Sequence, residues 1–219
     1  MNSPVHPQSE NALLRLRQFA RQRPPAERCE LCSRELVRGH EHLVEPESHK
    51  LVCACDACAI LFDAPSNAKY KRVPRSVRFL RDFRVTDAQW DSLRIPIEMA
   101  FFFHSSPRAR VIALYPSPAG AIESLLPLDT WEDIVEVNPV LRGMEADVLA
   151  LLADRVGRAR GSKGEEYYLV PIDKCYELVG LIRAHWRGLS GGTELWREVS
   201  SFFAGLKRQS ACHHEVSHA

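Results

Sequence analysis

Four cysteines in two Cys-x-x-Cys pairs are the residues of this sequence best suited to chemistry. Cys29 and Cys32 form the first pair, and Cys55 and Cys58 form the second, with 22 residues between the pairs. A Cys-x-x-Cys turn allows two thiolates to bind one ion, and two such turns complete the tetrahedron of four sulfurs that is typical of structural zinc. The sequence therefore predicts a Zn²⁺ site with these four cysteines as ligands.

Iron is the alternative metal for the same four thiolates, because a rubredoxin-type centre also uses two Cys-x-x-Cys pairs. Rubredoxin turns usually carry a glycine after the second cysteine, which lets backbone amides reach the sulfurs. Ser33 and Ala59 follow the two pairs here. This departure favours zinc and leaves iron as the alternative.

Cys53 and the histidines of the spacer are further groups that can bind a metal or activate water. Cys53 lies two residues before Cys55, so we interpret it as a buried hairpin thiol or as a ligand that replaces Cys55. His40, His42 and His49 lie between the two pairs, and we expect them on the surface or in a hairpin. A His-Asn-His nuclease uses such a histidine to activate water. Here, however, Cys58 is followed by Ala59 and not by the histidine or asparagine of those enzymes.

The second cysteine pair opens an apolar run, Ala59–Phe62, that predicts a short helix. Because the N-terminal end of a helix carries partial positive charge, we expect it to keep Cys55 and Cys58 as thiolates. A turn with the first pair, a β-hairpin and a helix with the second pair form a treble-clef or zinc-ribbon pattern. We therefore predict a cysteine-rich zinc-binding module over residues 27–66.

The composition is that of an ordinary soluble globular protein, with 45% hydrophobic and 26% charged residues in a chain of 219. No run of about 18 uncharged apolar residues is present, so we expect no membrane span. No export signal is evident at the N-terminus. Seven cysteines with metal-type spacing favour a reducing compartment over disulfides, and we expect a cytoplasmic protein.

Two flanking segments are expected outside the folded domains. Residues 1–26 predict an N-terminal tail with a short basic amphipathic helix that ends before Pro24. Residues 208–219 predict a disordered tail. Its groups able to bind a divalent ion transiently are Cys212, His213, His214 and His218.

A basic segment over residues 69–84 follows the predicted module. It holds seven cations against one acid, Asp82: Lys69, Lys71, Arg72, Arg75, Arg78, Arg81 and Arg84. Apolar residues alternate with arginines from Val77 to Val85, which predicts one strand with a solvated basic face. A charged edge strand is our first interpretation, a protein-binding surface the second and a nucleic-acid surface the third.

Residues 74–207 predict an α+β domain with a mainly antiparallel sheet closed by two C-terminal helices. Thr86 and Gln89 form a capping box that opens a short helix. Apolar runs predict strands over 97–103, 109–115, 121–126 and 166–171, and we favour a strand over a helix in 147–156. Further helices are predicted from the caps Asp129 and Thr193 and from about Asp173.

Several phrases of the sequence together resemble one uncharacterised bacterial family. They are Glu27–Cys32, His42–Val44, Leu51–Cys55, Arg94–Ile97, Phe101–Ser105, Tyr115–Gly120, Val170–Asp173, Leu181–Gly188 and Ser190–Gly192. The resemblance covers about residues 27–207. Genes of this family are similar to those found beside nickel–iron hydrogenase genes, so the resemblance implies a cytoplasmic hydrogenase accessory role. It supplies no catalytic residues.

We therefore expect a non-enzymatic assembly or adaptor protein for a nickel–iron hydrogenase, with Zn²⁺ as its cofactor. A hydrogenase subunit or maturation factor is the expected partner. A rubredoxin-like redox carrier with iron in the same site is the first alternative. Nucleic-acid binding by the zinc module and the basic segment is the second.

Overall fold

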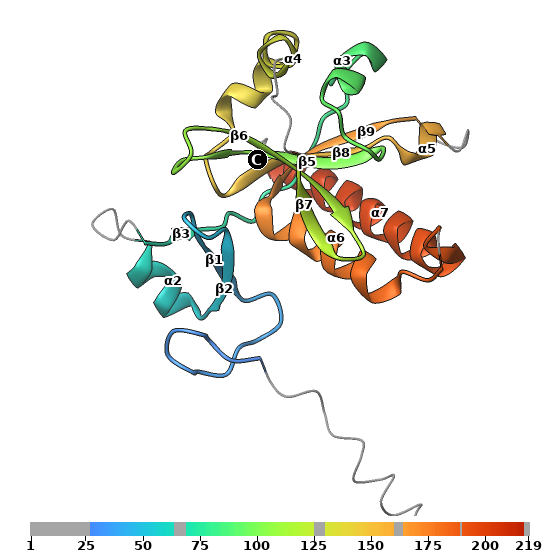
Figure 1. Cartoon of the computed structure of the whole chain (residues 1–219). Coiled ribbons are helices and arrows are strands. Elements are labelled where there is room, and N and C mark those ends of the chain that lie inside the picture. The colour runs from blue at the N-terminus through green and yellow to red at the C-terminus, as the bar shows by residue number, and fades with distance from the viewer. Residues whose placement is uncertain (1–26, 64–68, 125–129, 160–163, 189, 217–219) are drawn as a thin grey trace, which may run out of the picture.

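The computed structural model describes residues 27–63, 69–124, 130–159, 164–188 and 190–216. Within these ranges the chain is an α+β protein with two antiparallel sheets, one of three strands and one of six (Figure 1). The predicted N-terminal helix lies outside the described residues. No helix in the described part of the chain is long and apolar enough to cross a membrane.

The small sheet contains the strands β1 (Glu41–Glu45), β2 (Lys50–Ala54) and β3 (Lys71–Arg72) in the order β2-β1-β3. β1 and β2 form a hairpin in which His42 lies directly opposite Cys53. Helix α2 (Asp56–Phe62) follows β2 and contacts all three strands. This confirms the helix predicted from the apolar run after the second cysteine pair.

The large sheet has the strand order β4-β9-β8-β5-β6-β7, and every neighbouring pair is antiparallel. Its strands are β4 (Arg78–Phe79), β5 (Met99–Ser105), β6 (Arg110–Ser117), β7 (Gly120–Glu123), β8 (Leu149–Asp154) and β9 (Glu166–Pro171). β8 confirms the strand favoured in the ambiguous segment 147–156. β9 has the bounds that the sequence predicts.

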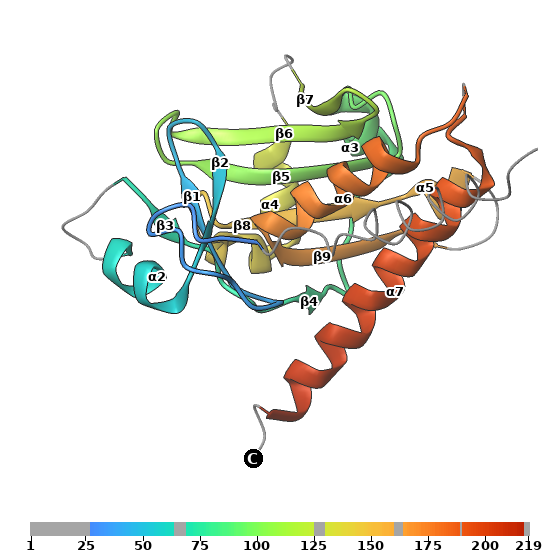
Figure 2. The same ribbon diagram turned by 90° about the horizontal axis from the view of Figure 1, so that it is seen from below.

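Both faces of the large sheet are covered, which explains the continuous apolar run Phe101–Phe103 in β5. Phe101 and Phe103 belong to one buried cluster, whereas Phe102 belongs to a second cluster on the other face. Helices α6 (Ile172–His185) and α7 (Gly192–Val216) pack on the first face, as Figure 2 shows. The second face carries α3 (Asp87–Ser92), α4 (Trp131–Val137) and the 3₁₀ helix η1 (Pro139–Gly143). The short helix α5 (Val156–Ala159) follows β8.

The predicted helix starts agree with the structure at α3 and, within one residue, at α6, whereas the predicted cap Thr193 lies inside α7, which begins at Gly192. The capping box is confirmed, since Thr86 and Gln89 exchange hydrogen bonds at the start of α3. Thr130 is the residue before α4, not Asp129, which lies outside the described residues. α7 continues through Val216, so the prediction of a disordered tail from residue 208 is wrong for 208–216.

The basic segment does not form the single strand that the alternating pattern predicts. β3 and β4 are two residues each, and the chain turns at Arg81 and Asp82. The reason is that this segment bends around an edge of the large sheet. Phe79 packs on Tyr168 in one buried cluster, and Phe83 packs on Tyr167 in the other.

The cations of this segment are largely paired with carboxylates, so the expected basic face is reduced. The pairs are Lys69 with Glu45, Lys71 with Asp147, and both Arg72 and Arg75 with Glu41. Within the described ranges only Arg78, Arg81 and Arg84 of the seven cations form no ion pair. This pairing weakens the case for a phosphate-binding surface.

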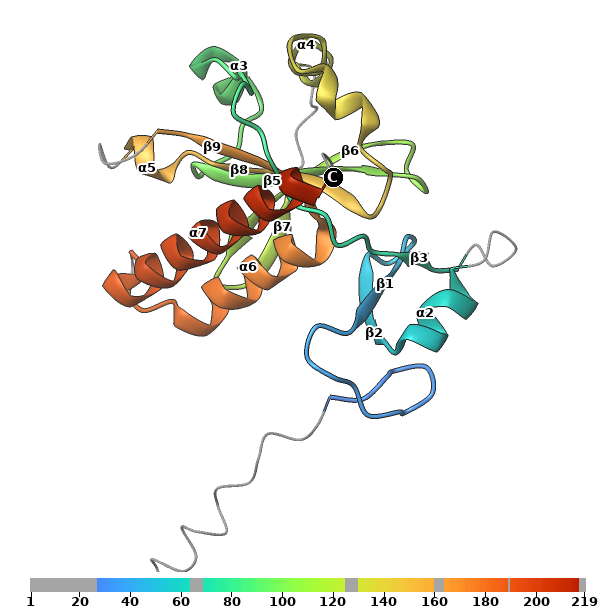
Figure 3. The same cartoon turned by 180° about the vertical axis from the view of Figure 1, so that it is seen from behind.

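The small sheet packs against the large domain, on the side that carries α6 (Figure 3). Val44 of β1 and Val73, which follows β3, belong to the buried cluster that also contains Phe103. The ring of His49, in the hairpin turn, lies with its centroid 5.1 Å from that of Phe103. Lys71 adds a polar link to the large domain, because its Nζ lies 2.7 Å from Asp147 Oδ2.

Asp147 is the most constrained carboxylate at this contact. Its side chain is fully buried, its φ is 71°, and it accepts hydrogen bonds from Lys71 Nζ and from the amide and hydroxyl of Ser106. Burial raises the pKa of Asp147, but these hydrogen bonds outweigh burial and hold the pKa below the ordinary value of 3.8.

We expect Asp147→Asn to lower the free energy of unfolding at neutral pH by about 1–3 kcal/mol, because Lys71 loses its charged partner. Asparagine tolerates the left-handed backbone, so the change is mainly electrostatic. Since the folded pKa is depressed, the carboxylate stabilises the protein above its ordinary pKa, and this contribution is lost as the pH falls through the folded value. Denaturant titrations of both proteins should therefore converge below about pH 3.8.

Glu145→Gln is the matched control, since Glu145 is exposed and should change stability by less than about 0.5 kcal/mol. A stability difference between Asp147→Asn and the unsubstituted protein that stayed constant from neutral pH to acid unfolding would contradict this assignment.

Candidate metal centre

The four predicted cysteines come together in the structure. All four sulfurs lie within 4.8 Å of one another: those of Cys29, Cys32, Cys55 and Cys58. The sulfurs of Cys32 and Cys55 are 3.7 Å apart, too far for a disulfide, and all four cysteines are free. Four sulfurs at about 2.3 Å from a central ion would be about 3.8 Å from one another in a tetrahedron. The four cysteines are thus positioned to bind a metal ion.

The first pair is presented by a tight turn. The amide of Ser33 donates to the carbonyl of Cys29, and the amide of Cys29 donates to the carbonyl of Arg34, both at 2.8 Å. Ser33 has a φ of 63°, the left-handed conformation for which glycine is the usual residue. The turn buries Cys29 and leaves Cys32 exposed.

The second pair is presented by the start of α2. Cys55 is the N-cap residue in extended conformation, and Cys58 lies in the first turn, where it is buried. A β-strand therefore leads one cysteine to the site and a helix returns the other. The strand and the helix thus place Cys55 and Cys58 beside the first pair, without a second tight turn of the kind that holds Cys29 and Cys32.

Glu30 joins the first turn to β2 and so brings the two pairs into register. Its amide donates to the carbonyl of Cys53, and its carboxylate accepts from the amide of Cys53, both at 2.9 Å. Lys50 donates to the same carboxylate at 3.2 Å. The Cys53 amide, followed by Lys50, lowers the pKa of Glu30 against the opposing effect of burial. Sequence reasoning missed this residue, whose only signal is its place inside the first Cys-x-x-Cys pair.

The pKa values of two of the four clustered thiols are shifted in opposite directions. Burial raises the pKa of Cys29, but the nearby amides of Cys55, Cys32 and Leu31 outweigh burial and lower the pKa to about 6. Burial and hydrogen bonds with the other three sulfurs raise the pKa of Cys58 to about 12. Burial and the neighbouring thiols thus oppose the effect that we expect from the helix N-terminus at Cys58 when no ion is bound. A cation is needed to deprotonate it.

The same amides remove one argument against iron. The absence of glycine after Cys32 predicts that amides do not reach the sulfurs, yet the amides of Cys55, Cys32 and Leu31 lower the pKa of Cys29. Ser33 adopts the glycine-like conformation and permits this geometry. The donor set of four thiolates fits either zinc or iron.

Cys53 does not belong to the four-sulfur cluster, so Cys55 and not Cys53 is the second-pair member placed there. Its sulfur instead lies within 4.8 Å of a ring nitrogen of His40 and of one of His42. The ring of His42 is partly buried and lies against Asp173, and that of His40 is nearly buried. These histidines belong to the hairpin, as expected, but they are not simply solvated surface residues.

The remaining candidate groups lie apart from the centre. Cys175 is fully buried in the core beneath α6. The side chains of the C-terminal candidates lie outside the described residues: Cys212, His213, His214 and His218.

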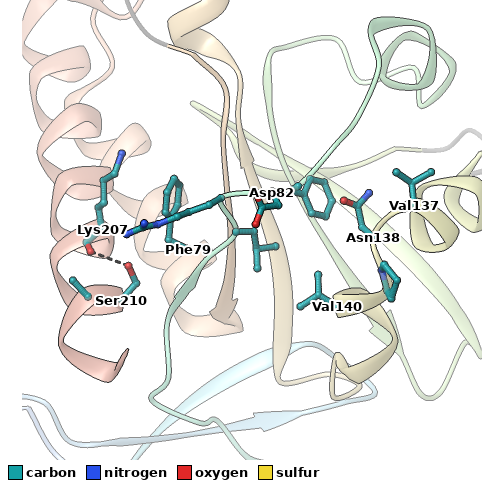
Figure 4. Close-up of a pocket in the computed structure, with 12 residues that line it drawn as sticks. Phe79, Asp82, Val137, Asn138, Val140, Lys207 and Ser210 are labelled. Carbon is teal, nitrogen blue, oxygen red and sulfur yellow. Dashed lines mark hydrogen bonds between the residues drawn. The ribbon is translucent and has the colours of Figure 1, made fainter. Parts of the chain in front are cut away.

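A surface groove of about 880 Å³ lies between the β4 segment, η1 and the end of α7 (Figure 4). Three of its polar residues, Asn138, Lys207 and Ser210, make contacts within the fold. Ser210 donates to the carbonyl of Lys207, and Asn138 exchanges two 2.8 Å hydrogen bonds with the backbone of Arg84. Lys207 also pairs with Glu166. The groove therefore presents a mixed surface and no convergent set of reactive groups comparable to the four cysteines.

We expect Cys58→Ala to abolish metal binding at the four-cysteine site and to unfold residues 27–63, because structural zinc contributes roughly 10–16 kcal/mol in small zinc modules. Elemental analysis should show loss of the metal bound by the four cysteines, and limited proteolysis should cut within 27–63. Circular dichroism of the large domain should persist. Cys175→Ala removes a buried thiol from the other core and should retain the metal. Full metal content in Cys58→Ala would refute the assignment.

Comparison with known proteins gives a family without an activity. Residues 28–210 match the family model DUF5947, described as a family of unknown function. No curated protein matches the chain, and no solved structure does. The matched range begins one residue before Cys29 and ends within α7, so it includes the four cysteines and both sheets. The chain belongs to the family DUF5947.

Proposed function

We propose that this chain is a non-enzymatic accessory or adaptor protein of a nickel–iron hydrogenase and that a structural zinc ion occupies its four-cysteine site. The observation that carries this proposal is an exposed apolar surface on α2, the helix that holds Cys58. Ile60 and Leu61 lie on α2 beside Cys58, and each has 67% of its surface exposed. A metal-fixed helix with two exposed aliphatic side chains is suited to binding another protein.

Zinc in this site is structural in the proposal because four thiolates fill a tetrahedral coordination sphere and leave no position for water or substrate. In the proposal, the turn, hairpin and helix that carry the four cysteines form a treble-clef-like zinc module. The buried cluster of this module contains six residues, two of which are ligands: Cys29, Leu43, Val52, Ala54, Cys58 and Ala59. So small a core requires a further stabilising interaction, which the ion supplies.

The exposed aliphatic residues favour a protein partner over a nucleic acid. Val37, in the loop before β1, is 76% exposed and adds a third apolar side chain to the same module. Burying one such side chain in an interface contributes roughly 1.5–3 kcal/mol. Four of the seven basic-segment cations are meanwhile paired with carboxylates.

The hydrogenase enters the proposal through the sequence resemblance over residues 27–207, and the partner is a hydrogenase subunit or maturation factor. A cytoplasmic location is part of the proposal, since free thiolates bind metal stably in a reducing compartment. The match to DUF5947 covers the same part of the chain and is consistent with one conserved domain organisation rather than with a named activity.

We expect the purified chain to bind the nickel–iron hydrogenase of the same organism, or one of its maturation factors, and Ile60→Asp or Leu61→Asp to weaken binding at least tenfold, about 1.4 kcal/mol. Calorimetry measures the affinity, and elemental analysis checks that the metal content is unchanged. Val137→Asp is the matched control, because Val137 is a 55% exposed aliphatic residue on α4 of the large domain. Equal affinity for all variants, or no binding to any hydrogenase component, would refute the proposal.

A rubredoxin-like iron carrier is the second candidate function, and two observations favour it. The amides of Cys55, Cys32 and Leu31 lower the pKa of Cys29, and amides close to the sulfurs tune the potential of iron–thiolate centres. Cys32 is exposed, which would place one ligand within reach of an electron-transfer partner.

Colour and metal content distinguish the two functions. Protein purified without a histidine tag should be colourless and contain zinc if the adaptor proposal holds. Red protein that contains iron and bleaches on reduction would establish the redox carrier instead.

A further inference from the structure

A second cluster of metal-ligand residues lies on the β1–β2 hairpin, separate from the four-cysteine site. One ring nitrogen of His40, one of His42 and the sulfur of Cys53 all lie within 4.8 Å of one another. The hairpin register explains this arrangement, since His42 and Cys53 are directly opposite and His40 precedes His42 by two residues. The two imidazole rings are edge to face, with centroids 4.8 Å apart.

Both histidines have an outer hydrogen-bond partner on Nδ1. Nδ1 of His42 lies 2.7 Å from Oδ2 of Asp173, at the start of α6, and Nδ1 of His40 lies 3.2 Å from the carbonyl of Val37. Each acceptor favours a proton on Nδ1, which leaves the lone pair on Nε2. Carboxylate and carbonyl partners of this kind orient histidines that bind metal ions.

His40 carries a polar atom that the protein leaves unsatisfied. Its side chain is 9% exposed, and its Nε2 is buried without a hydrogen-bond partner among the described residues. An unsatisfied buried nitrogen destabilises the folded protein, and native proteins rarely retain one without a reason. A cation bound to Nε2 removes this cost.

We propose that His40, His42 and Cys53 bind a second metal ion, a divalent transition-metal cation of the zinc type. Two imidazoles and one thiolate are the mixed donor set that Zn²⁺ and Co²⁺ accept. Three protein ligands leave one coordination position open, in contrast to the four-cysteine site. The inference goes beyond the proposed adaptor function and does not depend on it.

The ion would lie where the small sheet meets α6. His42 is the ligand whose outer partner, Asp173, belongs to the large domain, so this site would join segments 131 residues apart in sequence. The four-cysteine site, by comparison, uses ligands from residues 29–58 alone. The open position would accept water or one donor group from a partner.

The test is a metal titration of the full-length chain, purified without a histidine tag, stripped of metal and reconstituted with Zn²⁺. We expect two zinc equivalents per chain, and one equivalent in each of the variants His40→Gln, His42→Asn and Cys53→Ser. Asparagine at position 42 keeps an N–H that can donate to Asp173 but lacks Nε2. If this variant and the unsubstituted protein, each holding a single zinc, melt at the same temperature, the lost equivalent reports ligation and not folding.

Two controls locate the second equivalent. His185→Gln changes a histidine on α6 that pairs with Glu194, and the double variant His213→Gln, His214→Gln removes C-terminal histidines. Both should keep two equivalents. Co²⁺ added to protein that already holds one zinc should give the visible absorption of a tetrahedral ion with a thiolate ligand, and Cys53→Ser should abolish the thiolate band.

Binding of a single zinc by the unsubstituted protein would overturn the inference, as would two equivalents that persist in all three site variants. Failure here leaves the four-cysteine equivalent in place, whereas failure of the proposed function removes hydrogenase binding without changing zinc stoichiometry. The two outcomes are thus distinguishable.

Discussion

Four sulfurs from two separate turns must meet within a few ångströms, and this constraint organises the N-terminal part of the protein. The β1–β2 hairpin returns the chain so that the second pair reaches the first. Glu30 fastens the first turn to β2 through the backbone of Cys53. Residues 27–63 contain too few buried side chains to hold this geometry unaided, since units below about 40 residues usually need a metal, a disulfide or a partner.

The small sheet is not an independent domain. Val44 and Val73 contribute to the core that α6 and α7 cover, and Lys71 contacts the buried Asp147. The polar contacts between the small sheet and the large domain lie at the edge of the apolar contact between them. Hydrophobic burial therefore supplies the attraction between the two parts, and the paired charges fix how they are oriented.

The sequence allowed prediction of features that depend on local spacing. Four features follow from residues close together in the chain: the four-cysteine cluster, the helix α2 that starts at the second cysteine pair, the capping box at Thr86 and the strand Glu166–Pro171. These elements are determined by turn geometry, capping and apolar periodicity, which a short window contains.

Features that depend on distant partners could not be predicted in this way. The basic segment alternates like a strand, but it bends because Phe79 and Phe83 pack on opposite faces of the same sheet. Arg155 is buried among carboxylates from three different segments: Asp87, Glu98 and Glu165. The pairing of His42 with Cys53 depends on hairpin register, which periodicity alone does not specify.

The exposed face of α2 has a thermodynamic consequence. Because Cys55 and Cys58 belong to this helix, its order and the occupancy of the thiolate site are linked. Linkage is reciprocal. If a partner protein binds only ordered α2, it must raise the affinity of the chain for the ion by the same factor by which the ion raises the affinity of the chain for the partner. The cellular supply of zinc or iron would then set the fraction of protein molecules that can bind the partner. Molecules bound to the partner would lose their ion more slowly than unbound ones.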